Sequence, residues 1–165
     1  MIYLVTRNRQ LFKSEYYEII SLEKSIEIIK SWDLIQFDTE TSGRDPHVCK
    51  ILCAQFGNRK AGIQIVVDTS TIDICNYRNL LETKLIIGHN LKFDIQFLYN
   101  HDIIPENCWD TMIIEQLLHL GFNNKFFHYS LKDVAERRLK IDIDKTTRGE
   151  IIWRGLDDKV VLYAA

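Results

Sequence analysis

Several features of exported and membrane proteins are missing from this sequence. Its 165 residues contain no apolar run near the roughly 20 residues needed to cross a bilayer. Residues 1–10 also lack the basic lead, apolar block and cleavage site of a signal peptide. The four cysteines form neither a CxxC pair nor a Cys/His cluster with zinc spacing. We therefore expect a cytoplasmic protein that is not secreted, has no membrane association and carries no structural zinc or disulfide.

Proline is scarce, with two residues, and no low-complexity tract, internal repeat or linker interrupts the chain. With 46% hydrophobic and 27% charged residues, the composition predicts one globular domain over residues 1–165. Excess positive charge is missing too, because the net charge is −2. Proteins that bind nucleic acid by covering its phosphates are usually basic, but an enzyme that holds a strand end through bound cations need not be. Charge therefore neither supports nor excludes a nucleic-acid partner.

Apolar runs and helical spacing divide the chain into strands followed by alternating strands and helices. Apolar, β-branched runs predict strands over residues 2–6, 16–20, 34–40, 48–57, 62–68 and 84–90. Apolar residues at helical spacing predict helices over 22–32, 72–82, 91–100, 111–120, 130–139 and 157–165. This order favours an α/β fold, a mixed sheet with an antiparallel first part and helices on its faces.

Two carboxylates lie at the end of a predicted buried strand, in Phe37-Asp38-Thr39-Glu40. Residues i and i+2 of a strand point to the same face, so Asp38 and Glu40 lie side by side. Adjacent carboxylates repel each other, and a pair of hard divalent cations such as Mg²⁺ would offset that repulsion. Alone, the pair is also consistent with a strand cap and a solvated loop residue.

A second polar group follows the strand over 84–90, in GHNLKFD (88–94). Asn90 and Asp94 are four residues apart on a predicted first helical turn, which places them on one side of the helix. The positive end of the helix should favour the ionised form of Asp94. The alternative is an ordinary N-cap followed by an acidic first-turn residue. Tyr163, near the end of the chain, would by itself be a packing residue.

Together these segments resemble the DEDD exonuclease superfamily, in the branch whose third motif contains a tyrosine. The branch includes the proofreading domains of family A DNA polymerases and ribonuclease D. Its DxE motif matches FDTETSG (37–43) and its Nx₃D motif matches GHNLKFD. The region of its Yx₃D motif matches SLKDVAERRLKIDIDK (130–145), then Trp153 and the final LYAA. The resemblance runs from Ile2 to Ala165 and implies a ribonuclease H-like mixed sheet flanked by helices, the exonuclease fold.

The resemblance implies that Asp38, Glu40 and Asp94 bind two divalent metal ions, Mg²⁺ or Mn²⁺. Asp38 would bridge both ions, Glu40 would bind the ion nearer the attacking water, and Asp94 would support the second. Tyr163 would orient that water. The implied reaction releases 5′-mononucleotides, one at a time, from a nucleic-acid 3′ end.

Three further residues are implied to contact the substrate. Thr41 would help to hold the terminal nucleotide, and Asn90 would contact the strand or fix the local backbone. Arg44 departs from the family, because many family A proofreading domains have a leucine there that wedges against the terminal base. A guanidinium can stack on a base and reach a phosphate, although a solvated arginine is an equal alternative.

The third-motif aspartate belongs four residues after Tyr163, two beyond Ala165. We therefore expect the sequence to be a fragment of a longer chain, continued by a polymerase domain, and to be weakly active or inactive as it stands. The leading hypothesis is a proofreading domain that acts on single-stranded DNA 3′ ends. The alternatives are a ribonuclease D-like RNA trimmer and a non-catalytic nucleic-acid-binding domain on the same fold.

Overall fold

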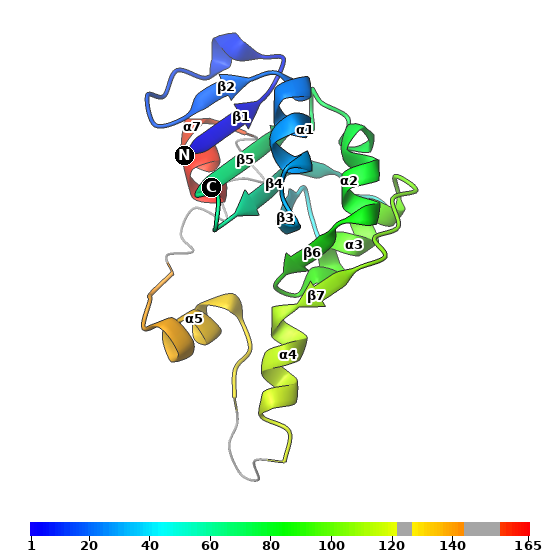
Figure 1. Ribbon diagram of the computed structural model, residues 1–165, viewed down its shortest axis with the longest axis vertical. Coiled ribbons are helices and arrows are strands. Elements are labelled where there is room, and N and C mark those ends of the chain that lie inside the picture. Colours follow the sequence, from blue (N-terminus) through cyan, green and yellow to red (C-terminus); the bar gives the residue numbers. More distant parts are fainter. Residues whose placement is uncertain (122–126, 144–155) are drawn as a thin grey trace.

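The computed structural model describes residues 1–121, 127–143 and 156–165, and they form one mixed sheet with helices on both faces (Figure 1). The sheet has the order β2-β1-β5-β4-β3-β6-β7. Its strands are β1 (Ile2–Val5), β2 (Glu18–Ile20), β3 (Leu34–Thr41), β4 (Ile51–Asn58), β5 (Ile63–Asp68), β6 (Leu85–Gly88) and β7 (Cys108–Asp110). With its flanking helices, this sheet confirms the predicted α/β, ribonuclease H-like class.

The helices divide between the two sheet faces and an extension. In chain order they are η1 (Arg9–Leu11), α1 (Leu22–Lys30), η2 (Ile74–Tyr77), α2 (Arg78–Thr83), α3 (Leu91–Tyr99), α4 (Thr111–Leu118), α5 (Leu131–Leu139) and α7 (Asp158–Ala164). Helices α1, α2 and α3 cover one face, and α7 lies on the other (Figure 1). None of the described helices has the length and apolar character needed to cross a bilayer.

Strand alternation separates the core into two clusters. Phe37, Phe56 and Ile65 pack on the face under α1, α2 and α3. The neighbouring positions Cys53 and Val66 point the other way and pack against Val161 of α7. Since successive strand residues alternate faces, this pattern fixes which face each polar residue of β3 occupies. Thr39 shares the face of Phe37, whereas Asp38 and Glu40 share the face of α7.

Helix α7 is attached to the other face by its N-terminal residues as well as by its core contacts. The Tyr17 hydroxyl, on the segment before β2, donates a hydrogen bond to Asp158 Oδ1. Burial and the adjacent Asp158 carboxylate raise the pKa of Tyr17 well above its usual range, so the phenol keeps its proton. This contact holds the helix that carries Tyr163 against the sheet.

The fold corrects three sequence-based expectations. The first part of the sheet is antiparallel only across β3, β4 and β5, whereas β1 runs parallel to both β2 and β5. The segment between β1 and β2, residues 6–17, is long enough for the crossover that parallel strands require. It also contains η1, which the sequence did not predict. The short strand β7 was missed because three residues carry too little pattern.

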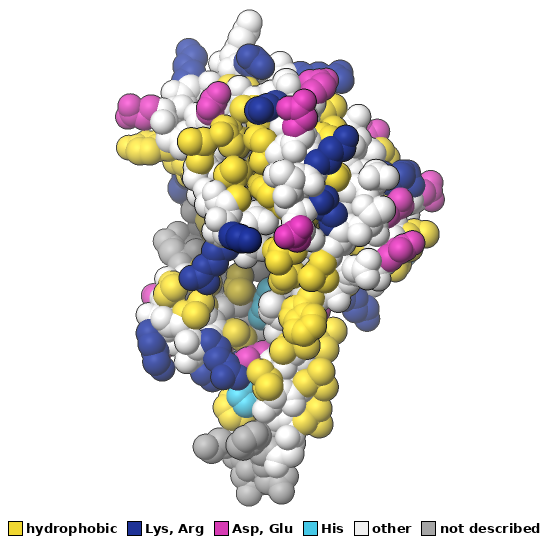
Figure 2. Space-filling model, in the orientation of Figure 1, with side chains coloured by type: hydrophobic (Ala, Val, Ile, Leu, Met, Phe, Trp, Pro, Cys, Tyr) yellow, Lys and Arg dark blue, Asp and Glu magenta, His cyan; other side chains and the backbone are white. Residues whose placement is uncertain are grey.

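Helices α4 and α5 extend away from the sheet (Figure 1). The Glu115 carboxylate on α4 is 5% exposed and accepts from Arg137 Nη2 at 2.9 Å and Arg138 Nε at 3.1 Å on α5. Burial opposes ionisation, but the two guanidinium groups outweigh it and hold the pKa of Glu115 below its usual range. Exposed apolar side chains run along α4, and basic ones gather on α5 (Figure 2). Glu115, Arg137 and Arg138, the Glu115 cluster, thus form a charged link between the two helices.

Candidate active site

The carboxylates of β3 lie at the end of an inner strand of the sheet, between β4 and β6. Asp38 is exposed and Glu40 is half-buried, and the pairing of β3 with β4 shifts register between Glu40 and Thr41. Such a bulge bends the strand and redirects its side chains. Opposite Glu40, burial and the charges of Glu40 and Asp38 hold the pKa of the Cys53 thiol above its usual range. The strand therefore concentrates negative charge at this point, as the sequence predicted.

Gln55 on β4 is a neighbour of Asp38 that the motif search missed. The two residues are directly paired across the strands, and Gln55 is 6% exposed. In the orientation that satisfies both ends of its amide, Gln55 Nε2 donates to the Asp38 backbone oxygen at 2.9 Å and to Asp38 Oδ2 at 3.2 Å. These bonds restrict the Asp38 carboxylate and hold one of its oxygens toward β4.

Asp94, in the first turns of α3, is 2% exposed. Its Oδ1 accepts two hydrogen bonds from Thr39, one from the backbone N–H at 2.9 Å and one from the hydroxyl at 2.6 Å. Burial, followed by the negative charge of Asp38, nevertheless raises the pKa of Asp94 to about 7. The helix N-terminus was expected to favour the ionised form. The backbone N–H of Asp94 in the first turn does favour that form, but loss of hydration and repulsion by Asp38 outweigh this contact.

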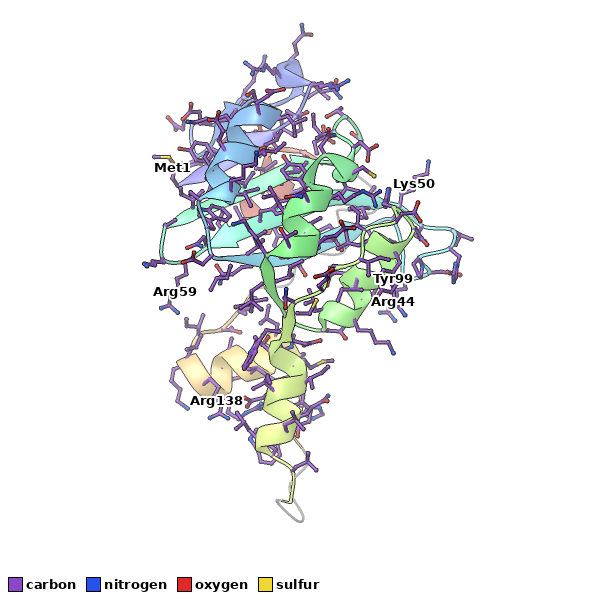
Figure 3. All side chains as sticks on the ribbon, turned by 45° about the vertical axis from the view of Figure 1, so that its right-hand side comes forward. Met1, Arg44, Lys50, Arg59, Tyr99 and Arg138 are labelled. Atoms are coloured by element: carbon purple, nitrogen blue, oxygen red, sulfur yellow. The ribbon has the colours of Figure 1, made fainter. Side chains whose placement is uncertain are left out.

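The carboxylates meet at a cavity of about 650 Å³ between the end of β3 and the start of α3. Its lining combines the acidic group with polar and aromatic side chains, namely Asp38, Thr39, Glu40, Thr41, Gly43, Arg44, His89, Asn90, Phe93 and Asp94. Figure 3 labels Arg44, which lies beside α3. Six of the seven residues proposed from the sequence therefore border one cavity. A volume of this size is within the range of small-molecule binding sites in proteins.

Individual residues at the cavity differ in how firmly they are held. The Thr41 hydroxyl donates to the Gly43 backbone oxygen at 2.6 Å, which fixes the chain after the carboxylate pair. Arg44 is exposed, and its side chain has no hydrogen-bond or ion-pair partner among the described residues. Phe93 packs against Phe97, with ring centroids 5.1 Å apart, and supports the floor of the cavity.

Tyr163, the seventh proposed site residue, lies half-buried on α7. Two residues earlier on the helix, Val161 packs against Cys53, whose strand partner is Glu40. Tyr163 thus belongs to the helix on the Asp38 and Glu40 face, although it is not among the residues that line the cavity. The related third-motif positions Asp144, Lys145 and Trp153 lie outside the described residues.

The donor set of the cavity fits hard divalent cations. Its three acidic side chains offer oxygen donors, which Mg²⁺ and Mn²⁺ prefer. Burial and the negative charge of Asp38 both oppose ionisation of Asp94, and positive charge beside the carboxylate would offset that opposition. A bound cation would reverse this effect and deprotonate Asp94.

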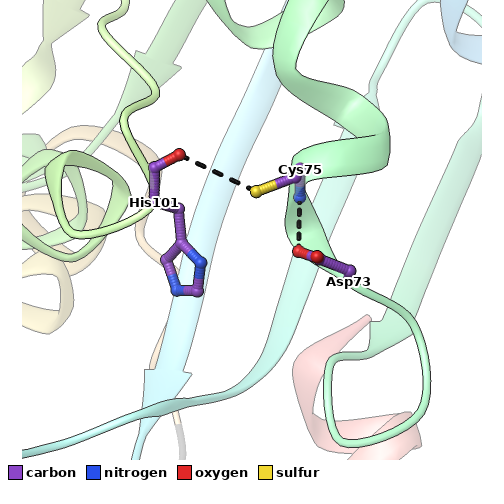
Figure 4. Close-up of side chains that lie close together, drawn as sticks. All are labelled: Asp73, Cys75 and His101. Atoms are coloured by element: carbon purple, nitrogen blue, oxygen red, sulfur yellow. Dashed lines mark hydrogen bonds between the residues drawn. The ribbon is translucent and has the colours of Figure 1, made fainter.

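A second group with metal-ligand chemistry lies away from the cavity (Figure 4). One ligand atom each of Asp73, Cys75 and His101 lies within 4.8 Å of the others. Asp73 Oδ1 accepts from the Cys75 backbone N–H at 2.9 Å, and the Cys75 thiol donates to the His101 backbone oxygen at 3.7 Å. Arg78 Nη2 also donates to that oxygen, at 2.7 Å, and brings a positive charge to the group. These contacts account for the cluster as the junction between η2 and the turn after α3.

Comparison with known proteins agrees with this geometry. Residues 16–165 match the model of a 3′-5′ exonuclease family, that of the DNA polymerase A exonuclease domain. This chain belongs to that 3′-5′ exonuclease family. Its members and structural neighbours are DEDD exonucleases, so the resemblance seen in the motifs is confirmed.

Three relatives illustrate the range of proteins that share the domain. DNA polymerase I of Aquifex aeolicus is 33% identical over 147 residues, which cover 87% of this chain and 23% of that protein. The chain therefore spans about a quarter of the length of that relative. RNase D of Escherichia coli superposes with a TM-score of 0.71 at 17% identity, over 98% of this chain and 40% of RNase D. NrnC of Brucella melitensis, solved with bound Mg²⁺, superposes with a TM-score of 0.67 at 19% identity, over 99% of this chain and 72% of NrnC. The two structural likenesses establish the fold.

Proposed function

We propose that this domain is a metal-dependent exonuclease that removes 5′-mononucleotides from nucleic-acid 3′ ends. The supporting observation is the convergence of Asp38, Glu40 and Asp94 at one cavity, where burial and the charge of Asp38 raise the pKa of Asp94. Membership of the 3′-5′ exonuclease family supports the direction of cleavage. The bound Mg²⁺ of NrnC, which shares the fold, supports the choice of metal.

Asp38, Glu40 and Asp94 are the residues that would hold two Mg²⁺ or Mn²⁺ ions. Bound there, the ions supply charge stabilisation for an in-line phosphoryl displacement and lower the pKa of the attacking water. Thr39 fixes one oxygen of Asp94 and Gln55 fixes one oxygen of Asp38, so the protein orients two of the three ligands before the metal arrives.

The remaining site residues act on the water and the substrate. Tyr163 would orient the attacking water, because a phenol keeps its proton at neutral pH and suits positioning better than proton removal. Thr41 would hold the terminal nucleotide, and the exposed Asn90 amide would contact the strand. Arg44, unpaired within the described part of the chain and bordering the cavity, would stack on a base or bind a phosphate.

We propose a single-stranded DNA 3′ end as the substrate, in the service of proofreading by a family A-like DNA polymerase. The supporting observation is the identity to the Aquifex polymerase, which exceeds that to the RNA-processing neighbours. On this proposal residues 1–165 form the exonuclease domain of a polymerase chain. A ribonuclease D-like role is the second candidate, supported by the shared fold. The cluster of carboxylates argues against a non-catalytic domain, since a scaffold gains nothing from their repulsion.

The test uses the full-length protein and compares its degradation of 5′-labelled DNA and RNA oligonucleotides of matched sequence, with Mg²⁺ and with EDTA. We expect a ladder that shortens from the 3′ end with Mg²⁺, faster on DNA than on RNA, and no cleavage with EDTA. Faster degradation of RNA than of DNA would contradict the proofreading role and favour the ribonuclease D-like role. Binding of the oligonucleotides without cleavage at saturating Mg²⁺ or Mn²⁺ would contradict the enzymatic function itself.

A further inference from the structure

Asn90, the residue immediately before α3, has an unusual backbone conformation. Asn90 occupies the N-cap position with φ 62° and ψ 41°, in the left-handed region, and its side chain accepts no capping hydrogen bond. The N-cap residues of α1, α4, α5 and α7 are instead extended, and each side chain accepts from a backbone N–H of its own helix. Asparagine is among the best N-cap residues. Something therefore prevents Asn90 from capping α3.

The carboxylate of Asp110 takes over that role from a different strand. Asp110 Oδ1 accepts from the backbone N–H of Asn90 at 3.0 Å, and Oδ2 accepts from that of Leu91 at 2.8 Å. Oδ1 also accepts from Met112 N at 2.8 Å, so one carboxylate caps α4 and holds the start of α3. A charged acceptor at two backbone N–H groups forms strong hydrogen bonds, which can maintain a strained backbone.

The next residue secures the same junction. Thr111 Oγ1 donates to the Gly88 backbone oxygen at 3.0 Å, and His89 Nδ1 lies 3.0 Å from the same hydroxyl. A side chain at Gly88 would be crowded, because its Cβ would lie 3.0 Å from the Phe37 backbone oxygen on β3. The junction of β7 and α4, through Asp110 and Thr111, thus holds residues 88–91 in place beside the cavity.

We propose that Asp110 is a positioning residue that holds Asn90 in the left-handed conformation and so keeps its amide in the cavity, available to the nucleic acid. Without the Asp110 carboxylate, the left-handed backbone loses its support. Asn90 then returns to the extended conformation, and its side chain caps α3 at the N–H of Lys92 or Phe93. The loss of substrate contact rests on the proposed function. The change in the conformation of Asn90 does not depend on it.

The conformational part is tested by thermal unfolding of four proteins: wild type, Asn90→Gly, Asp110→Ala and the double variant. Glycine accepts the left-handed region without strain, so Asn90→Gly leaves the wild-type Tm unchanged or raises it. In the Asp110→Ala background the same change removes the new cap, and Tm falls. If Asn90→Gly changed Tm equally in the wild type and in Asp110→Ala, the proposal would be overturned. If Asp110→Ala does not fold, Asp110→Asn replaces it, since the amide nitrogen opposes one of the backbone donors.

The functional part is tested by KM for a single-stranded oligonucleotide. Asn90→Gly and Asp110→Ala each raise KM by about five-fold, the loss of roughly one hydrogen bond, and the double variant is no worse than either. Asp73→Ala is the matched control, because Asp73 also caps a helical segment with its carboxylate but lies away from the cavity. It lowers Tm without changing KM. The positioning role would be overturned if the double variant raised KM by the product of the two single effects. It would also be overturned if Asp73→Ala raised KM as much as Asp110→Ala.

The two tests separate this inference from the proposed function. If even the wild type cleaves no oligonucleotide with saturating metal, the proposed function fails. The Tm comparison still decides whether Asp110 controls the conformation of Asn90.

Discussion

Thr39 donates both its backbone N–H and its hydroxyl to a single oxygen of Asp94, Oδ1. Thr39 is the middle residue of the first acidic motif, and its side chain points to the opposite face from Asp38 and Glu40. These two hydrogen bonds therefore connect the first motif, on β3, to the second motif, on α3. Neither bond from Thr39 goes to Asp94 Oδ2, which leaves that oxygen available to a cation.

Replacing Thr39 with valine tests this connection. Valine keeps the shape and the backbone bond but removes the hydroxyl that donates at 2.6 Å. We predict that the Mg²⁺ concentration for half-maximal nuclease activity rises about ten-fold, because hydrogen bonds behind a metal ligand orient it. Thr69→Val is the control, since the Thr69 hydroxyl donates to the Ile51 backbone oxygen outside the cavity. An unchanged Mg²⁺ requirement for Thr39→Val would contradict the connection.

The raised pKa of Asp94 predicts a pH dependence of stability in the metal-free protein. Because the folded-state pKa of about 7 exceeds the ordinary value of 3.8, the folded protein binds this proton more tightly than the unfolded chain. The stabilisation is fully present below about pH 4 and is lost as pH rises to about 7. The total effect is at most about 4 kcal/mol.

The measurement is urea unfolding of wild type and Asp94→Asn in EDTA between pH 5 and 8. Other groups titrate in both proteins, so the difference between their free energies of unfolding isolates Asp94. Asp94→Asn gains stability relative to wild type as pH rises, and Mg²⁺ stabilises only the wild type at pH 8. A difference that stays constant over this range would show that Asp94 is ionised throughout.

The attachment of α7 through Tyr17 predicts a distant effect on activity. Tyr17→Phe removes the hydroxyl that donates to Asp158 but keeps the ring in the core. We predict a loss of about 1 kcal/mol in stability and a fall in kcat of several-fold, since α7 carries Tyr163. Tyr16→Phe is the matched control, because Tyr16 is 70% exposed. Equal kcat values for Tyr17→Phe and Tyr16→Phe would show that the Tyr17 hydrogen bond does not affect activity.

The buried Glu115 predicts an acid-sensitive link between α4 and α5. Its pKa is depressed, so its contribution to stability is present above the ordinary value of 4.5 and is lost as pH falls through the lower folded-state value. Glu115→Gln leaves two guanidinium groups without their charged partner and should cost roughly 1–3 kcal/mol at pH 7. Chemical denaturation measures this, with the exposed Glu136→Gln as control. A difference of less than about 0.5 kcal/mol between the variants would contradict the role of the cluster.

Much of the site could be predicted from the sequence because its motifs are local. Asp38 and Glu40 are two residues apart on a strand, so their shared face follows from backbone geometry alone. The assignment of α3 to the residues after Asn90 was also confirmed. What local pattern cannot give is burial, and Asp94 is the example. Its ionisation depends on the burial that comes from packing α3 against β3, which outweighs the expected effect of the helix N-terminus.

The supporting residues were missed for a related reason. Thr39, Gln55 and His89 reach the site through strand pairing and through contacts 22 to 55 residues away in sequence. The register of β3 with β4 could have identified Gln55, because it places position 55 opposite Asp38. The left-handed conformation of Asn90 has no such local signal, since it depends on Asp110, 20 residues further along the chain.

The central claim is that the carboxylate cluster performs metal-dependent cleavage from the 3′ end, and Asp38→Ala tests it most directly. The measurement, made on the full-length protein, is the rate of shortening of a 5′-labelled single-stranded DNA in Mg²⁺, with Tm recorded for each variant. Asp33→Ala is the control, an exposed aspartate just before β3. The account predicts that Asp38→Ala lowers the rate about 100-fold or more, with a Tm equal to or above that of wild type because carboxylate repulsion is relieved. A rate within two-fold or so of the Asp33→Ala control, in a folded protein, would contradict it.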